Sequence, residues 1–202
     1  MAEQNPRIGL IGPAQRANPA LARAVELLLG DTAVRQVIYL GADDAPHALV
    51  AEWSRKGIGE QDFLRSGVDL ACAGTADQIS ALLAEEREVS RLQRVRALPP
   101  PPARAIEMMD RFLVLAVYDK AVLDEDDIAN AQVIVYGRAE EAAWKRFGPR
   151  CFFTPGPLAR GHVGCLELLQ EGLLEVRLLD LDGAVRMREP LQATGGKLVV
   201  TP

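Results

Sequence analysis

The sequence predicts an α/β protein in which two mixed β-sheets pack face to face as a sandwich and helices flank them. Three observations support this prediction. Short apolar runs alternate with helical patterns from residue 7 to residue 92, which is typical of parallel strands joined by helices. Beyond residue 103, apolar runs are separated by turn residues, which indicates strand pairs. With 202 residues, of which 49% are apolar, the chain can bury one large core without a disulfide or metal.

The first half of the chain contains three repeats of a strand followed by a helix. Asn18 is placed to cap the first helix, Pro19 suits its first position, and Gly30 ends it. The third repeat begins with Asp69-Leu70-Ala71-Cys72-Ala73, which we interpret as a strand turned by Gly74. The expected strands are 7–11, 37–40 and 69–73, and the expected helices are 19–29, 45–56 and 76–92.

The second half follows a stiff proline connector at 99–102 and contains mostly strands. The expected strands are 105–109, 112–118, 132–136, 151–153, 164–169, 173–179 and 184–188, with one short helix at 123–129. We interpret the last four strands as an antiparallel meander. No change of composition follows the connector, so we expect a single domain over 1–202, with halves at 1–98 and 103–190 and a tail at 191–202.

Charge and cysteine content limit the classes of partner. The net charge of −5 and the pI of about 5.2 argue against nucleic acid as a partner. No apolar stretch is long enough to span a bilayer, so no membrane partner is expected. Cys72, Cys151 and Cys165 form no C-x-x-C pair, and we expect all three to be buried apolar residues of a cytoplasmic protein.

Two features occur in order along the chain. The first is a strand, a glycine-containing loop and a helix from Ile8 to Leu29, and the second is Val133-Ile134-Val135-Tyr136-Gly137 followed by Phe153-Thr154-Pro155-Gly156-Pro157. Together they resemble the calcineurin-like metallophosphoesterases, in particular their compact bacterial phosphodiesterase branch, over nearly the whole chain. The resemblance implies a two-sheet sandwich flanked by helices. It also implies a pair of metal ions at the strand ends that activates a hydroxide for phosphoester hydrolysis.

In that family the metal ligands follow successive strands as D-x-H, G-D, G-N, a lone histidine and G-H-x-H. The corresponding residues here are Pro13 and Gln15, Gly41 and Ala42, Gly74 and Thr75, Tyr118, and Gly137 to Glu140. The resemblance therefore implies a fold that is kept while its ligands are lost, and we expect neither a metal nor another cofactor. The chain has only two histidines, His47 and His162, whereas a dinuclear site draws on several imidazoles.

The former active-site cleft is the candidate ligand site. Its expected lining residues are Gln15, Arg16, Asp43, Thr75, Tyr118, Arg138 and Glu140. The guanidinium of Arg138 would either replace the charge of a lost metal and bind a small anion, or pair internally with Glu140, Asp43 or Asp44. The Asp43-Asp44 pair suits the capping of the next helix better than a metal site.

The helix expected at 76–92 carries Ile79, Leu82 and Leu83 on one face, and a run of charged residues begins at Glu85. This charged segment is either a solvated face or a ridge that binds a partner.

Our main hypothesis is an inactive phosphoesterase-like protein that acts as a binding or regulatory scaffold through protein–protein contacts, with a homodimer as one option. One alternative is a residual metal-dependent phosphodiesterase, which requires metal ligands converging at strand ends. The other is a sensor of a nucleotide or other small anion, which requires positively charged groups in the cleft that no carboxylate neutralises.

Overall fold

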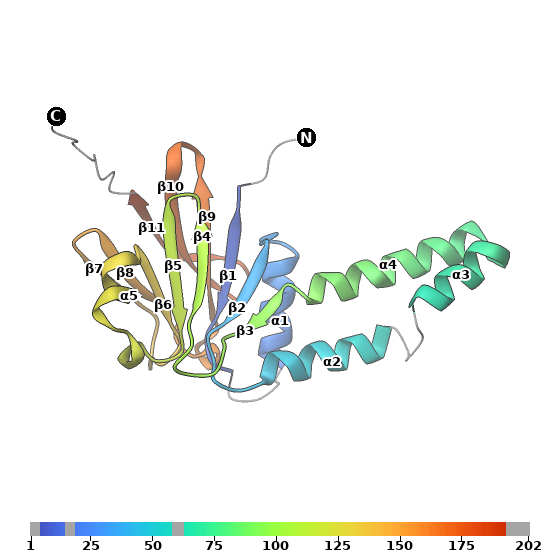
Figure 1. Ribbon diagram of the computed structural model, residues 1–202, viewed down its shortest axis with the longest axis horizontal. Coiled ribbons are helices and arrows are strands. Elements are labelled where there is room, and N and C mark those ends of the chain that lie inside the picture. The colour runs from blue at the N-terminus through green and yellow to red at the C-terminus, as the bar shows by residue number, and fades with distance from the viewer. Residues whose placement is uncertain (1–4, 15–18, 58–62, 193–202) are drawn as a thin grey trace.

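Two mixed β-sheets lie face to face at the centre of the protein (Figure 1), and the computed structural model describes residues 5–14, 19–57 and 63–192. The six-stranded sheet has the spatial order β11 (Val185–Gln192), β10 (Leu173–Asp180), β9 (His162–Leu169), β1 (Arg7–Ile11), β2 (Gln36–Tyr39) and β3 (Val95–Ala97). The five-stranded sheet has the order β4 (Ala105–Met109), β5 (Phe112–Val117), β6 (Val133–Tyr136), β8 (Arg150–Thr154) and β7 (Ala143–Phe147).

Helices flank both sheets. The α-helices are α1 (Pro19–Leu29), α2 (Ala45–Gly57), α3 (Phe63–Ala73), α4 (Ala76–Leu92) and α5 (Glu125–Asn130), and the short 3-10 helices are η1 (Lys120–Val122), η2 (Leu158–Arg160) and η3 (Gln170–Gly172). Figure 1 shows α1 and α5 on opposite sides of the two sheets. The predicted fold class, a two-sheet sandwich flanked by helices, is therefore confirmed.

The main core lies between the sheets, where alternate side chains of each strand point inward. Ile8 and Leu10 of β1 face Val133 and Val135 of β6 within one buried cluster. Two-residue alternation is the expected pattern of a strand, and strands buried on both faces are typical of the parallel part of such a sheet. The inner face is therefore filled from both halves of the chain.

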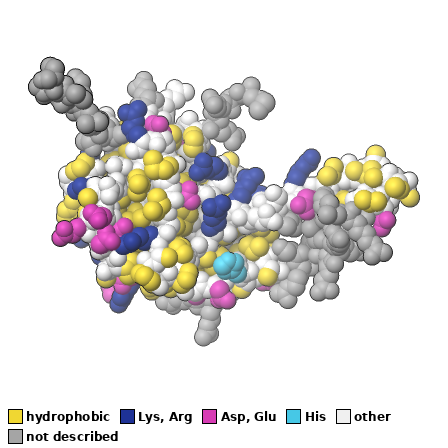
Figure 2. All heavy atoms as spheres, in the orientation of Figure 1, with side chains coloured by type: hydrophobic (Ala, Val, Ile, Leu, Met, Phe, Trp, Pro, Cys, Tyr) yellow, Lys and Arg dark blue, Asp and Glu magenta, His cyan; other side chains and the backbone are white. Residues whose placement is uncertain are grey.

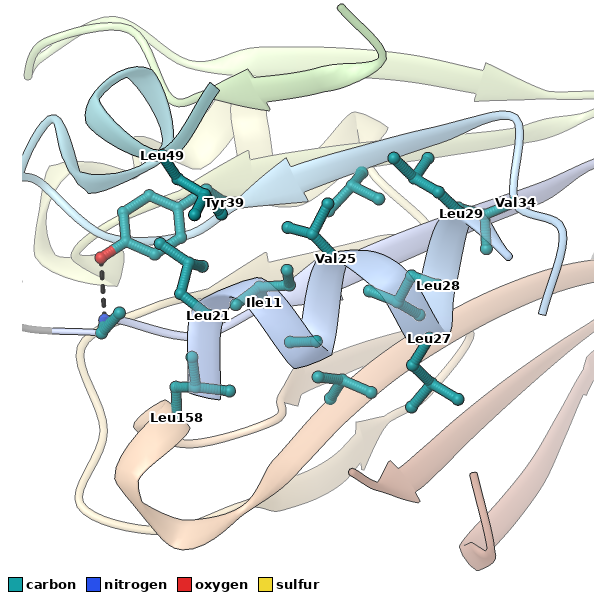
Figure 3. Packing of buried hydrophobic residues seen from close by; sticks show 14 of the residues in the cluster. Ile11, Leu21, Val25, Leu27, Leu28, Leu29, Val34, Tyr39, Leu49 and Leu158 are labelled. Atoms are coloured by element: carbon teal, nitrogen blue, oxygen red, sulfur yellow. Dashed lines mark hydrogen bonds between the residues drawn. The ribbon is translucent and has the colours of Figure 1, made fainter. Parts of the chain in front are cut away.

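A second core lies between the six-stranded sheet and α1 (Figure 3). Leu21, Val25 and Leu28 follow the helical period and pack against Ile11 and Tyr39 of the sheet. All five side chains are fully buried. This packing fixes the position of β1 and β2, whose carboxyl ends reach the candidate site.

The connection from β2 to β3 is much longer than neighbouring parallel strands require. A crossover needs about a dozen residues, whereas this one contains α2, α3 and α4. The first half of α2 packs on the core through Ala45 and Leu49. Figure 1 shows α3 and α4 extending away from the sandwich. We call α3 and α4 the helical arm.

The arm corrects one prediction from the sequence. The run Asp69–Ala73 is the last part of helix α3, not a strand, and the third strand of the sheet is β3 instead. A short run rich in Ala and Leu suits a helix as well as a buried strand, and Ala has the highest helix propensity. Cys72 is accordingly exposed on the arm, whereas Cys151 and Cys165 are buried as expected.

The predicted meander is correct only for its last three strands. β9, β10 and β11 are antiparallel neighbours, but β8 lies in the other sheet, parallel to β6. Its antiparallel neighbour is β7, an edge strand that the sequence analysis did not predict. Among the described residues, no helix is long and apolar enough to cross a membrane.

Candidate functional site

The carboxyl ends of four strands meet at one edge of the sandwich. β1 and β2 are parallel neighbours in one sheet, and β5 and β6 are parallel neighbours in the other. The loops that follow these strands therefore emerge on the same side, where ligands of open α/β sheets usually bind. We call the residues that follow these strands and β8 the strand-end edge.

Two glycines allow the strand-end loops of the two sheets to touch. A Cβ on Gly137, after β6, would overlap the carbonyl oxygen of Leu40, after β2. A Cβ on Gly12, after β1, would overlap the carbonyl oxygen of Gly156, in the turn after β8. Any larger residue at these two positions would push the sheets apart. The absence of a side chain at these two glycines thus permits the loops of the two sheets to approach each other closely at the strand-end edge.

Tyr39 connects the loops after β1 and β2. Its oxygen accepts a hydrogen bond from the backbone N–H of Ala14 at 2.8 Å, and its hydroxyl donates to Asp43 Oδ1 at 2.8 Å. Asp43 Oδ1 also accepts from the N–H of Ala45, the first residue of α2, at 3.1 Å. One carboxylate therefore caps the helix, as expected, and also binds the tyrosine.

Burial raises the pKa of Tyr39, and the hydrogen bond to Asp43 and its negative charge raise it further. The phenol is thus a neutral hydrogen-bond donor at physiological pH. Asp43 is directed toward the protein's own groups and is not available as an independent ligand.

Arg138 pairs with Asp119, which the sequence analysis did not consider. The guanidinium Nη1 donates to Asp119 Oδ2, so the expected partners Glu140, Asp43 and Asp44 were wrong. The two residues come together because β5 and β6 are parallel neighbours and each residue lies two positions beyond its strand. Asp119 also accepts from the N–H of Ala121 at 3.0 Å and caps η1.

The pKa values of this pair move in opposite directions. The hydrogen bond from Ala121 lowers the pKa of Asp119 most, and the hydrogen bond from Arg138 lowers it further. The same hydrogen bond raises the pKa of Arg138. Both groups stay charged at neutral pH, so Arg138 carries a neutralising carboxylate beside it.

The backbone after β5 and β6 is also tied together. The N–H groups of Arg138 and Gly137 both donate to the carbonyl oxygen of Tyr118, at 2.7 Å and 3.0 Å. Tyr118 and Glu140 both lie at this edge. The Tyr118 side chain is half-buried, and Glu140 is exposed. Gln15 and Arg16 lie outside the described residues.

The sequence itself matches no family model and no curated protein. Solved structures are nevertheless similar over most of the chain. Vacuolar protein sorting 29 from Cryptosporidium parvum has a TM-score of 0.54 at 13% identity, and the match covers 94% of this chain and 100% of that chain. A predicted phosphoesterase from Streptococcus pneumoniae has a TM-score of 0.53 at 11% identity, covering 94% and 99%. Yfce, a phosphoesterase from E. coli, has a TM-score of 0.52 at 14% identity, covering 91% and 98%.

The chain has the calcineurin-like phosphoesterase fold. The resemblance inferred from the order of the sequence motifs is thereby confirmed at the level of fold. Because the third parallel strand of the sheet is β3, the motif expected at Gly74 and Thr75 does not follow a strand. Gly74 and Thr75 lie between α3 and α4, at the outer end of the arm (Figure 1), so Thr75 is not part of the strand-end edge. The residues that follow β3 are Leu98 and Pro99.

The described residues of the strand-end edge do not fit the two-metal centre that this fold implies. Pro13 follows β1 and Ala42 follows β2 at this edge, and Pro99 follows the neighbouring parallel strand β3. None of the three has a side chain that coordinates a metal. Arg138, which follows β6, brings a positive charge instead. Over the described ranges, no group of three or more His, Cys, Asp or Glu side chains could hold a metal ion.

One edge residue was missed by the sequence analysis. His162 begins β9, which runs antiparallel to β1, so its register places it level with Gly12 at the strand-end edge. Its Nδ1 is buried and has no hydrogen-bond partner among the described residues. The sequence pattern predicts ligands at the carboxyl ends of parallel strands, whereas an antiparallel neighbour such as β9 contributes its first residue to that edge.

Proposed function

We propose that this calcineurin-like fold serves as a binding or regulatory scaffold that works through protein–protein contacts, without metal-dependent hydrolysis. The internal pairing at the strand-end edge supports the absence of hydrolysis. Asp43 is bonded to Tyr39 and to the start of α2, and Arg138 is bonded to Asp119. These polar groups stabilise the loops of the protein itself.

The observation that carries the binding role is the helical arm. Val68 is 62% exposed and Leu83 is 43% exposed, and Ile79 is also exposed. Among the arm residues whose burial is described, only Leu92, at the root of α4, is buried. Exposed apolar side chains gathered on one element are a mark of interaction surfaces. Figure 2 shows apolar side chains gathered over the outer end of the arm.

The energetics of the arm favour a partner. Isolated helices of fewer than about 12 to 15 residues are marginal in water, and most helical stability in proteins comes from packing an apolar face. α3 has 11 residues and packs mainly against α4. A partner that covers the apolar side chains of both helices would stabilise the arm. We propose a protein partner with an apolar surface of its own, because the exposed arm residues Val68, Ile79 and Leu83 are all aliphatic.

Names among the structural neighbours are compatible with either role. One neighbour is named a phosphoesterase and another is named for vacuolar protein sorting. The fold by itself does not decide between catalysis and binding. The arm and the internal pairing favour binding in this chain. The pairing of Arg138 with Asp119 also weighs against an anion sensor that depends on Arg138.

Co-purification from the native host would test this proposal. Tagged wild type, Val68→Asp and Leu83→Asp would be compared with Ile106→Asp. This control alters an apolar residue on β4, outside the arm, that is 59% exposed and thus at least about as exposed as the two arm residues. We expect a stoichiometric partner with the wild type and with Ile106→Asp, and its loss with both arm variants. Equal capture by all four proteins would contradict the arm as the binding surface. Hydrolysis of bis-p-nitrophenyl phosphate that needs added manganese and stops on chelation would contradict the absence of catalysis.

A further inference from the structure

A second site lies at the opposite ends of the strands from the strand-end edge. A pocket of about 520 Å³ opens where β2 and β3 begin and where α4 returns to the sandwich. Figure 2 shows Lys and Arg side chains gathered between the body and the arm. The lining residues are Arg35, Gln36, Ser90, Gln93, Arg94, Arg96 and Glu107.

Strand pairing brings three arginines to this pocket. Arg35 directly precedes β2, Arg94 directly precedes β3, and Arg96 lies on β3 opposite Ile38. The N–H of Val37 donates to the carbonyl oxygen of Arg94 at 2.9 Å, which fixes the starts of the two strands side by side. The backbone that carries these positive charges is therefore held in place by strand pairing.

Glu107 of β4 neutralises only part of this charge. Its carboxylate oxygens lie 3.8 Å from Arg35 Nη2 and 3.9 Å from Arg96 Nη1. Both distances exceed that of a hydrogen bond, so the two guanidinium groups keep their donors. The Arg94 side chain makes no ion pair or hydrogen bond with the described residues. Three arginines and one glutamate leave a surplus of two positive charges.

A buried amide donor points to a ligand as well. Gln36 is only 7% exposed and lines the pocket. Its Nε2 is buried and has no hydrogen-bond partner among the described residues. Buried polar groups in folded proteins are nearly always hydrogen-bonded, so a lone donor in a pocket needs an explanation. A ligand oxygen in the pocket would accept this hydrogen bond once the Gln36 side chain turns its Nε2 toward the pocket.

We propose that this pocket binds the phosphate group of a small organic phosphate. A phosphate monoester carries up to two negative charges and three acceptor oxygens, which match the charge surplus and the donors of the arginines and Gln36. The volume lies within the range of small-molecule sites. The chain's net charge of −5 disfavours a polyanion such as a nucleic acid. The site is separate from the strand-end edge and does not depend on the proposed partner of the arm.

Calorimetric titration would test the site with inorganic phosphate, adenosine 5′-monophosphate and adenosine. We expect both phosphates to bind the wild type and adenosine not to bind. Arg94→Ala should weaken binding at least tenfold, and Arg138→Ala, a matched arginine change at the strand-end edge, should leave it unchanged. Glu107→Gln should tighten binding because it removes the negative charge found among the described lining residues of the pocket, and weaker binding by this variant would contradict the proposal.

A second readout concerns Gln36 in the absence of ligand. Gln36→Leu should raise the melting temperature of the free protein, because it removes a buried donor that lacks a partner, and should weaken phosphate binding. Failure of both phosphates to bind the wild type at millimolar concentration would overturn the proposal. Binding that Arg94→Ala does not weaken, or that Arg138→Ala abolishes, would overturn it too. The arginines would then only offset Glu107 and the negative end of the α4 dipole.

Discussion

Tyr39 donates a hydrogen bond of 2.8 Å to Asp43 and so links the end of β2 to the start of α2. The same phenol oxygen accepts from Ala14 in the loop after β1. Tyr39 is fully buried among Ile11, Leu21 and Leu49 (Figure 3). A single polar atom at the end of an apolar side chain thus joins three segments at the strand-end edge.

Tyr39→Phe should lower the free energy of unfolding by about 1–3 kcal/mol, the typical cost of removing one partner from buried hydrogen bonds. The apolar ring is retained, so the loss reports on the hydroxyl alone. Thermal and urea denaturation of wild type and variant would measure it. Unchanged stability would contradict the role given to this hydroxyl.

The same variant should change how stability depends on high pH. The pKa of Tyr39 is raised above its ordinary value of 10.0 in the folded protein, so folding favours the protonated phenol. This contribution is fully present below pH 10 and is lost as the pH rises above the unfolded pKa. The difference in stability between wild type and Tyr39→Phe should therefore shrink above about pH 10, as urea denaturation from pH 8 to pH 11 would show.

Two glycine substitutions should have opposite effects. Gly137→Ala should destabilise the protein by about 1–3 kcal/mol, because its Cβ overlaps Leu40 and the backbone must shift. Gly67→Ala should stabilise α3 by about 0.5–1 kcal/mol, because its Cβ meets no atom within 4 Å and Ala favours a helix. Melting temperatures would measure the first change, and amide hydrogen exchange in α3 the second. A melting temperature of Gly137→Ala that equals or exceeds that of the wild type would rule out the close contact of the two sheets at Gly137.

Arg138→Ala should raise the pKa of Asp119 but leave it below its ordinary value of 3.8. The backbone hydrogen bond from Ala121 is the largest cause of the lowered pKa, and it remains in the variant. Titration of the Asp119 carboxyl carbon by NMR would measure the pKa of Asp119 in the wild type and in Arg138→Ala. The stabilising contribution of Asp119 is present above pH 3.8 and is lost as the pH falls through its folded pKa. A value at or above 3.8 in the variant would assign the shift to the guanidinium instead.

Only Cys72 should react with a thiol reagent at pH 8 in the folded protein. Burial raises the pKa of Cys151 and of Cys165 to about 12, so neither forms appreciable thiolate. Cys72 is exposed on α3. Titration with Ellman's reagent should find one thiol in the native wild type and none in Cys72→Ser. All three should react in guanidinium chloride, and more than one native thiol in the wild type would contradict the packing described here.

Most of the sandwich could be predicted from the sequence because its strands and helices carry strong local signals. β1, α1 and β2 show apolar runs and periods bounded by glycine and proline, and their predicted limits are within about one residue of those observed. β3 has only three residues and carries Arg96 at its centre, so its pattern is too short to detect. The apolar end of α3 carries the stronger strand-like pattern in the sequence, although it is helical.

The pairing of Arg138 with Asp119 could not be deduced from either segment alone. The two residues lie 19 positions apart and meet only because β5 and β6 become neighbours in the sheet. Glu140, Asp43 and Asp44 lie within or near the motifs that resemble the family, so the sequence favours them as partners of Arg138. The order of the strands in the sheet, which brings Asp119 beside Arg138, is not visible in these motifs. The basic pocket was missed for the same reason, since it depends on β2 pairing with β3 and on Glu107 of the facing sheet.

The length of the crossover from β2 to β3 has a consequence for how freely the arm can vary. The crossover leaves β2 and returns to its immediate neighbour β3, so the two ends of the whole insertion, which contains α2 and the arm, lie close together in the sheet. The entropy of closing a loop grows only with the logarithm of its length, and a doubling adds only about 0.6 kcal/mol. Shortening or extending α3 and α4 would therefore change the stability of the sandwich little. Sequence drift would accumulate in the arm at small cost to folding, and new contacts could arise there without disturbing either sheet.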